Sequence, residues 1–182
     1  MKNRSFFRIG RDLHPGLGPL MVLLVLLLPG CPEWPFEPGQ SVIYFDSFET
    51  PADTSGWTGL SPAMFVDDPA PGQGLRSLRI GGGCVQPTAY RNLDPVFEEG
   101  DYQLSLWGRV NDPNQSGSVI LRLADVSDQE ISVTLHENRW VYYRNPNTLH
   151  VPAGSRMRIE IVIGGIVPAS MNIDGLAVLK IE

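Results

Sequence analysis

From residue 41 to the C-terminus, apolar residues recur in short blocks, where most alternate with polar residues, and no long stretch has the period of a helix. Gly, Pro, Asn and Asp separate the blocks, as they do at turns between strands. The blocks cover 42–48, 77–80, 88–93, 102–110, 118–124, 130–135, 140–145, 157–163 and 171–181. Eight to nine short strands with no helix between them predict an all-β domain, an antiparallel β-sandwich. We expect 51–76, the longest irregular piece, to lie across one end of it.

The strand period of two assigns a core side and an outer side to each block. The predicted core comprises Tyr102, Leu104, Leu106, Val110, Val119, Leu121, Leu123, Ile131, Val133, Leu135, Met157, Ile159, Ile161 and Ile163. The opposite, solvent-facing set comprises Gln103, Ser105, Trp107, Arg109, Ile120, Arg122, Ala124, Ser132, Thr134, His136, Arg158, Glu160 and Val162. Any flat binding surface has to be assembled from this second set.

The N-terminus has the layout of a secretory signal, in which a basic stretch precedes a short apolar one. Four basic residues and one acid precede an uninterrupted apolar run from Leu20 to Leu28, which is too short to cross a hydrocarbon core of about 30 Å as a helix. The run leads into Leu28-Pro29-Gly30-Cys31, which resembles a bacterial lipobox, where the cysteine is lipidated and becomes the new N-terminus. The alternatives are an ordinary signal peptide cut elsewhere and an uncleaved membrane anchor.

These features predict three parts: a signal peptide over 1–30, a lipidated Cys31 with a Pro-rich tether over 31–40, and the β-sandwich domain over 41–182. Each proline of the tether fixes φ and removes a donor, so we expect a stiff, extended segment. Lipidation of Cys31 would leave Cys84 as the remaining thiol, which we expect to be buried as a small hydrophobe.

Composition excludes several classes of function. The formal charge is -6, from 14 basic and 20 acidic residues, and no Lys/Arg cluster offers the cationic surface that nucleic acids require. Two cysteines cannot form a disulfide framework or a cysteine-rich zinc site. The chain has neither a Gly-x-Ser-x-Gly elbow nor a His-Glu-x-x-His pair, and we therefore expect no enzymatic activity.

Several short motifs follow one another in a characteristic order. They are Asp46-Ser47-Phe48-Glu49, Gly56-Trp57, the segments 74–80 and 102–109, Arg139-Trp140, and the segment 171–176. Together they resemble the jelly-roll carbohydrate-binding modules of the galactose-binding-domain-like superfamily, which accompany bacterial glycoside hydrolases. The resemblance covers 41–182 and implies that the sandwich is a jelly roll.

The resemblance also implies a structural calcium ion that joins the N-terminal and C-terminal strands. Glu49 and Asp174 stand at the matching positions. Calcium takes six to eight oxygen ligands, so backbone carbonyls and water would complete the site. The alternative is that Asp174 caps a bulge at Gly175 and that Glu49 is solvated.

Finally, the resemblance implies a sugar platform. Sugar rings have apolar faces and polar edges, so such a platform needs exposed aromatic residues flanked by hydrogen-bonding groups. The candidates are Trp107, Tyr90, Asn92, Arg122, Thr134, Arg158 and Glu160, with His136, Trp57 and Tyr143 as further options. The alternatives are that a loop covers Trp107 and that Arg158 and Glu160 form an ordinary solvated pair. Trp140, which follows a turn, is expected in the core.

These features predict a non-catalytic lipoprotein of the bacterial cell envelope, anchored to a membrane by lipid, whose jelly roll binds a cell-surface or environmental polysaccharide. The alternative is a structural or assembly lipoprotein that uses the sandwich to contact another envelope protein. A groove lined by aromatic residues would favour the first function, and a flat apolar patch the second.

Overall fold

A computed structural model describes residues 39–50, 54–82, 88–93, 98–126, 128–163 and 169–182. The predicted signal peptide, Cys31, tether residues 32–38 and Cys84 lie outside these ranges, whereas Gly39 and Gln40, also assigned to the tether, are described, and Gln40 begins the first strand. Among the described residues, no helix is long and apolar enough to cross a membrane.

The alternating blocks form strands, joined by turns and one short 3-10 helix, η2 (Pro62–Met64). The strands are β1 (Gln40–Asp46), β2 (Trp57–Thr58), β3 (Phe65–Val66), β4 (Ser77–Gly81), β5 (Ala89–Leu93), β6 (Gly100–Val110), β7 (Gly117–Leu123), β8 (Glu130–Leu135), β9 (Val141–Arg144), β10 (Leu149–Val151), β11 (Met157–Ile163) and β12 (Ser170–Ile181).

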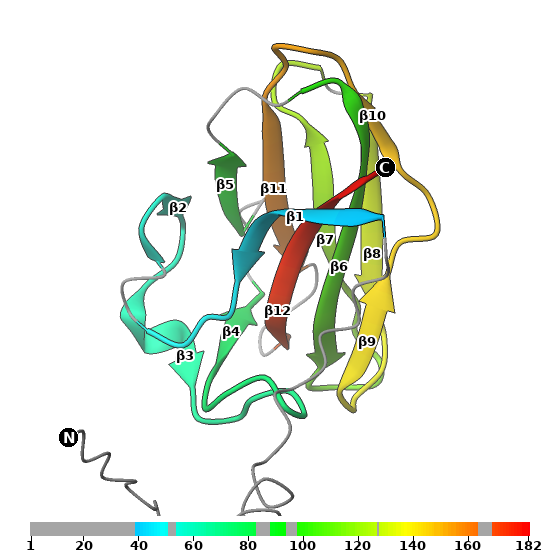
Figure 1. The fold of residues 1–182 in the computed structure, drawn as a ribbon. Coiled ribbons are helices and arrows are strands. Elements are labelled where there is room, and N and C mark those ends of the chain that lie inside the picture. The colour runs from blue at the N-terminus through cyan, green and yellow to red at the C-terminus, as the bar shows by residue number, and fades with distance from the viewer. Residues whose placement is uncertain (1–38, 51–53, 83–87, 94–97, 127, 164–168) are drawn as a thin grey trace, which may run out of the picture. The chain divides into compact units, whose positions relative to one another are not determined.

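The strands form two antiparallel sheets, which confirms the predicted sandwich. In the seven-stranded sheet, called sheet A, β12 pairs along one side with β6 and along the other with β4 and β1. The free side of β6 pairs with β9 and β10, and β3 extends the sheet beyond β4. The five-stranded sheet, called sheet B, has the order β2-β5-β11-β7-β8. Figure 1 shows β12 and β6 of sheet A in front of β11 and β7 of sheet B.

The core lies between the two sheets and contains every residue that the strand period predicts for it. All fourteen predicted core side chains are at most 8% exposed, and Leu104, Leu121, Ile159 and Ile161 are completely buried. Each such side chain contributes roughly 1.5–3 kcal/mol by leaving water. Burial of the alternate residues therefore fixes which side of each strand faces outward.

The nine predicted strands are all present, and three short ones, β2, β3 and β10, are added to them. The first strand ends at Asp46 rather than residue 48, because Phe48 takes a positive φ of 54° and turns its ring into the core, where it is completely buried. The part of 51–76 that is described contains β2 at an edge of sheet B and β3 at an edge of sheet A. This piece of chain therefore contributes one short strand to each sheet.

Three expectations about exposed and buried positions are wrong. Gln103 and Ser105 belong to the predicted solvent-facing set but are only 7% and 1% exposed. The Gln103 amide donates to the Asn145 carbonyl oxygen at 2.7 Å and accepts from Arg144 Nε at 2.5 Å, so its polar atoms are satisfied without water. Glu160 of the same set is 6% exposed.

Trp140 is not a core residue. It is half-buried and lies outside the core cluster. The Arg109 guanidinium lies over its ring, with Cζ 5.4 Å from the ring centroid. Because Arg109 leaves β6 on the side away from the core, the Trp140 ring contributes to the outer surface of sheet A.

Candidate functional site

Six of the seven platform candidates lie on the outer face of sheet B. Residues directly opposite each other in an antiparallel ladder point to the same side of the sheet. Arg158 of β11 lies opposite both Asn92 of β5 and Arg122 of β7, and Glu160 lies opposite Tyr90. We call this surface the sheet B face, and its residues are Tyr90, Asn92, Arg122, Glu130, Thr134, Arg158 and Glu160.

Trp107, the seventh candidate, lies on the opposite side of the molecule. It leaves β6 on the outer side of sheet A, where its ring packs against that of Tyr142 with a centroid separation of 5.5 Å. The structure therefore does not bring Trp107 together with the other six candidates. Any common site has to be built without it.

Glu160 is the centre of an ion-pair network on the sheet B face. One of its carboxylate oxygens lies 3.7 Å from Arg158 Nη1, and the other lies 3.5 Å from Arg122 Nε. Arg122 also pairs with Glu130, at the start of β8. The Glu160 side chain is 8% exposed, whereas the two arginine side chains are 25% and 32% exposed. The buried carboxylate therefore holds two partly exposed guanidinium groups in fixed positions.

Tyr90 is the aromatic residue of this surface within the described chain. The Arg158 guanidinium lies over its ring, with Cζ 4.9 Å from the ring centroid, a cation–π arrangement. Arg158 Nε also donates to Asn92 Oδ1 at 2.7 Å. Arg158 thus contacts an aromatic ring, an amide and a carboxylate, and the surface around it is partly exposed and rich in hydrogen-bonding groups.

The further options do not belong to this surface. Trp57 is in the core beside Phe48, and its Nε1 donates to Asp46 Oδ2 at 2.9 Å. Tyr143 packs against the core from β9. His136 is exposed beyond the end of β8, with its ring 6.3 Å from that of Tyr143.

Sequence reasoning missed two residues of the outer surfaces, Glu130 and Tyr142. Glu130 begins the strand that follows the turn after residue 124, so pairing of 118–124 with 130–135 as a hairpin would have placed it opposite Arg122. Tyr142 had a similar signal: successive residues of a strand point to opposite sides, so Tyr142 and Tyr143 in 140–145 cannot both face the core. Neither signal predicts the contact of Glu130 with Arg122 or of Tyr142 with Trp107, because both contacts depend on which residues the paired strands place opposite each other.

The two proposed calcium ligands lie on either side of the loop 70–76. Asp174 is completely buried, and its oxygens accept from the backbone N–H groups of Ala70 at 3.0 Å and Gly175 at 2.7 Å. The Glu49 carboxylate accepts from the backbone N–H of Leu75 at 3.1 and 3.2 Å. A Cβ on Gly74 would lie 2.1 Å from Glu49 Oε1, so only glycine allows this approach.

The pKa of Asp174 is raised from 3.8 to about 7, chiefly because burial disfavours its charge; the nearby Glu49 and Asp46 carboxylates add to the rise, and the two backbone donors oppose it. Carboxyl oxygens are therefore brought together here in a place where their charge is costly, and hard oxygen donors of this kind suit calcium. Within the described ranges, no three His, Cys, Asp or Glu residues are grouped to hold a metal ion, so backbone oxygens would have to complete a site.

The structure also contains the bulge that the alternative invoked. The register of β12 against β6 shifts between Asp174 and Ala177, Gly175 has a φ of 52°, and the Asp174 carboxylate accepts from the Gly175 N–H. Glu49, in contrast, is not simply solvated, because it holds the backbone of the 70–76 loop.

Comparison with protein-family models finds no match, and comparison with curated proteins finds none either. Solved structures do match. The CBM22-1 xylan-binding domain of Paenibacillus barcinonensis Xyn10C is 15% identical, with a TM-score of 0.55 over 81% of this chain and 99% of that one. The C-terminal family 22 carbohydrate-binding module of Clostridium thermocellum Xyn10B is 19% identical, with a TM-score of 0.53 over 77% and 93%. At these identities the likeness establishes the fold, which is the jelly roll of carbohydrate-binding modules.

Proposed function

We propose that this domain binds a carbohydrate through the sheet B face. The observation that carries the proposal is the arrangement around Arg158, which joins the Tyr90 ring, Asn92 and Glu160 on one open surface. The fold supports it, since this chain shares the jelly roll of xylan-binding modules. Fold alone does not determine function, so the chemistry of the sheet B face has to suit a carbohydrate as well.

The chemistry of the surface suits a sugar. A sugar ring can lay its C–H face against an aromatic ring while its hydroxyls bond to neighbouring polar groups. Tyr90 supplies the ring, and Asn92 and Arg158 supply an amide and a guanidinium beside it. Because Glu160 already holds Arg158 and Arg122, these groups lose little freedom when a ligand binds. With one aromatic residue, we expect a weak complex with a dissociation constant of about 1 mM, or roughly −4 kcal/mol.

The test is affinity electrophoresis of the full-length protein in detergent through gels that contain xylan, galactan or other soluble polysaccharides. We expect retardation by at least one polysaccharide, loss of it in Tyr90→Ala, and recovery in Tyr90→Phe, which restores the ring. Tyr142→Ala removes an aromatic ring from the opposite face and is the matched control. If the folded protein is retarded by no polysaccharide, or if only Tyr142→Ala loses retardation, the sheet B face is not a sugar site.

We also propose that the chain is a lipoprotein of the bacterial cell envelope, attached to a membrane through lipid on Cys31. The support is the sequence pattern, in which basic residues, a short apolar run and a small residue precede this cysteine. Several acyl chains on one residue give firm attachment, because each buried methylene adds roughly 0.8 kcal/mol. The sheet B face would then act at a membrane surface.

A structural calcium ion is a further proposal. Glu49 and Asp174 would hold it, together with backbone oxygens, and the bound charge would relieve the cost of burying the Asp174 carboxylate. The ion would join the chain that follows β1 to the bulge of β12. Its role would be to stabilise the fold, since both residues lie away from the sheet B face.

One observation favours the alternative, in which the sandwich contacts another envelope protein. Val42 and Phe45 of β1 are 45% and 39% exposed and lie opposite Leu179 and Ala177 on the outer side of sheet A. An apolar surface of this kind suits a protein contact. A partner that co-purifies in equal amounts with a chain that binds no polysaccharide would favour this function.

A further inference from the structure

The sheet B face contains two arginines side by side. Arg158 of β11 and Arg122 of β7 are directly opposite each other in the antiparallel ladder, and side chains at such positions have Cβ atoms about 4.5–5.5 Å apart. Both side chains are partly exposed, at 32% and 25%. Like charges directly opposite each other repel, so this arrangement needs negative charge close to both guanidinium groups.

Glu160 supplies one negative charge from a buried position. Its side chain is 8% exposed, and its two oxygens lie 3.7 Å from Arg158 Nη1 and 3.5 Å from Arg122 Nε. The first distance is too long for a hydrogen bond. The second is not one either, because Arg122 Nε has no hydrogen-bond partner within the described chain. Glu160 therefore offsets the two positive charges without occupying the N–H groups of either guanidinium.

The hydrogen-bonding groups that the sheet B face offers to a ligand are mainly donors. Arg158 Nε donates to Asn92 Oδ1 at 2.7 Å, and no described residue accepts a hydrogen bond from the two terminal nitrogens of Arg158. The same bond occupies the Asn92 oxygen and leaves the N–H groups of its amide. Arg122 donates from one terminal nitrogen to Glu130, at the margin of the face, and keeps the other. A ligand here therefore meets N–H groups from three side chains.

A carboxylate matches a surface of this kind. An ionised carboxyl group only accepts hydrogen bonds, whereas a sugar hydroxyl both accepts and donates. A planar guanidinium can bind both oxygens of a carboxylate at once, through charge-assisted bonds about twice as strong as neutral ones. We propose that the ligand of the sheet B face is an acidic polysaccharide whose uronic acid carboxylates bind Arg158 and Arg122. This choice of ligand class rests on the carbohydrate site proposed above.

Tyr90 and Asn92 favour a sugar acid over a simple polyanion. Arg158 Cζ lies 4.9 Å from the centroid of the Tyr90 ring, so a carboxylate bound by Arg158 is close to an aromatic ring. In a uronic acid the carboxyl group is attached directly to the pyranose ring. One sugar unit can therefore place its C–H groups near Tyr90 and its carboxylate on Arg158, while the Asn92 amide donates to a neighbouring oxygen.

The overall charge of the chain opposes an acidic ligand, but this effect is weaker than the local one. The formal charge is -6. At physiological ionic strength, exposed charges more than about 8 Å apart are largely screened, so the contacts with Arg158 and Arg122 outweigh the average charge of the chain. An acidic protein also gives no general attraction for polyanions. Binding of an acidic polysaccharide would therefore report short-range contacts at this face.

The experiment compares acidic polysaccharides with neutral forms of the same backbones. Affinity electrophoresis of the full-length protein in detergent uses gels that contain polygalacturonate, alginate or glucuronoxylan, or the carboxyl-reduced form of each. Carboxyl reduction turns the carboxylate into a hydroxymethyl group and keeps the rings and linkages. For at least one backbone, we expect about ten-fold tighter binding of the acidic form. This preference should decline as NaCl is added.

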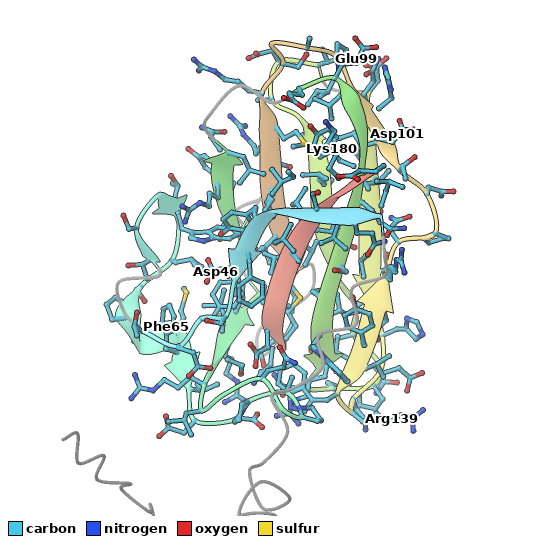
Figure 2. The ribbon with its side chains drawn as sticks, in the orientation of Figure 1. Asp46, Phe65, Glu99, Asp101, Arg139 and Lys180 are labelled. Atoms are coloured by element: carbon cyan, nitrogen blue, oxygen red, sulfur yellow. The ribbon has the colours of Figure 1, made fainter. Side chains whose placement is uncertain are left out.

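Variants of Arg158 test its part in this preference. Arg158→Gln should reduce the preference for the acidic form to less than about two-fold, and Arg158→Lys, which keeps the charge without the planar fork, should restore only part of it. Arg139→Gln removes the same charge at a 79% exposed position and should keep the full preference. It is a distant control, since β11 begins at the upper end of the sandwich (Figure 1) and Arg139 lies at the lower end (Figure 2).

Equal retardation by acidic and carboxyl-reduced forms would overturn this ligand class and leave the carbohydrate site intact, whereas no retardation by any form would overturn both. Equally strong retardation by poly-L-glutamate or dextran sulfate would also overturn it, because the face would then bind anions in general. An unchanged preference in Arg158→Gln would do so too. The comparison of the two forms uses the chain without substitutions, so it decides the question even if a variant does not fold.

Discussion

Gly108 offers a direct test of the register that places Trp107 and Arg109 on the outer side of β6. Gly108 lies on the core side of the strand and faces Leu135 of β8 across the sandwich. A Cβ at this position would lie 2.1 Å from Leu135 Cδ2 and 2.9 Å from its Cγ. Because Gly108 is in an extended strand and not among the residues with positive φ, alanine fits its backbone and only the space decides the outcome.

The expected magnitude follows from two opposing effects. Overpacking a core costs about 1–3 kcal/mol, whereas replacing glycine by alanine restricts the unfolded chain and stabilises by about 0.4–1 kcal/mol. We therefore expect Gly108→Ala to lower the free energy of unfolding by about 1–2 kcal/mol. Leu135 is completely buried, so Leu135→Ala alone should cost about 2–5 kcal/mol.

The double variant separates this explanation from general damage. The space left by Leu135→Ala receives the new Cβ of Ala at position 108, so the double variant should be more stable than the sum of the single losses by about 1 kcal/mol or more. Urea unfolding of the four chains gives this coupling energy. Gly81→Ala is the control, since the nearest atom to its new Cβ is the Ala169 carbonyl oxygen at 4.0 Å. It should therefore raise the free energy of unfolding by about 0.4–1 kcal/mol, because the restriction of the unfolded chain is not opposed by a clash.

Additive losses, or a Gly108→Ala protein as stable as Gly81→Ala, would refute the reasoning. Gly108 would then not face Leu135, and the alternation along β6 would be shifted by one residue. Trp107 and Arg109 would then lie in the core, and Trp107 would not pack against Tyr142 on the outer side of sheet A.

Two further predictions concern the anchor and the metal. Cys31→Ala should release the protein from the membrane fraction into the soluble fraction of the cell, and continued association would instead indicate an uncleaved signal. Calcium at about 100 times its dissociation constant should stabilise the fold by about 2.7 kcal/mol, which corresponds to a rise of roughly 5–10 °C in the thermal midpoint. Asp174→Asn should abolish this rise, while Glu98→Gln, which changes an exposed acid elsewhere, should keep it; an equal rise in both variants would contradict the proposed ligands.

Alternation along the chain predicted the fold because burial depends on which side of a strand a residue occupies, and the period of two encodes that side. It did not predict which outward residues would be exposed. Ser105 points outward as expected yet is buried, because exposure depends on what lies over a face as well as on the direction of the side chain. The prediction for Trp140 was wrong for a related reason. Its apolar ring suggested a core position, but the Arg109 guanidinium packs over the ring on the outer side of the sheet.

The sheet B face was predictable in part. The period assigned Arg158 to an outer surface, and it does the same for Tyr90 and Asn92 only if Leu93 faces the core, as it does. Their contacts depend on how β5 pairs with β11, and Asn92 and Arg158 are 66 residues apart in the chain. A shift of two residues would keep the same faces and separate these side chains. The central position of Glu160 follows from the same register and has no signal in local sequence.

The charged groups of the sheet B face are held by one another, and this has a consequence for its variants. Arg122 and Arg158 each pair with Glu160 and keep part of their side chains exposed, so the face is stable without a cover. Damage to this face should therefore weaken ligand binding with little change in unfolding free energy. Damage to the core, as in Leu135→Ala, should lower stability while polysaccharide retardation of the folded protein persists, so the two measurements distinguish a binding residue from a core residue.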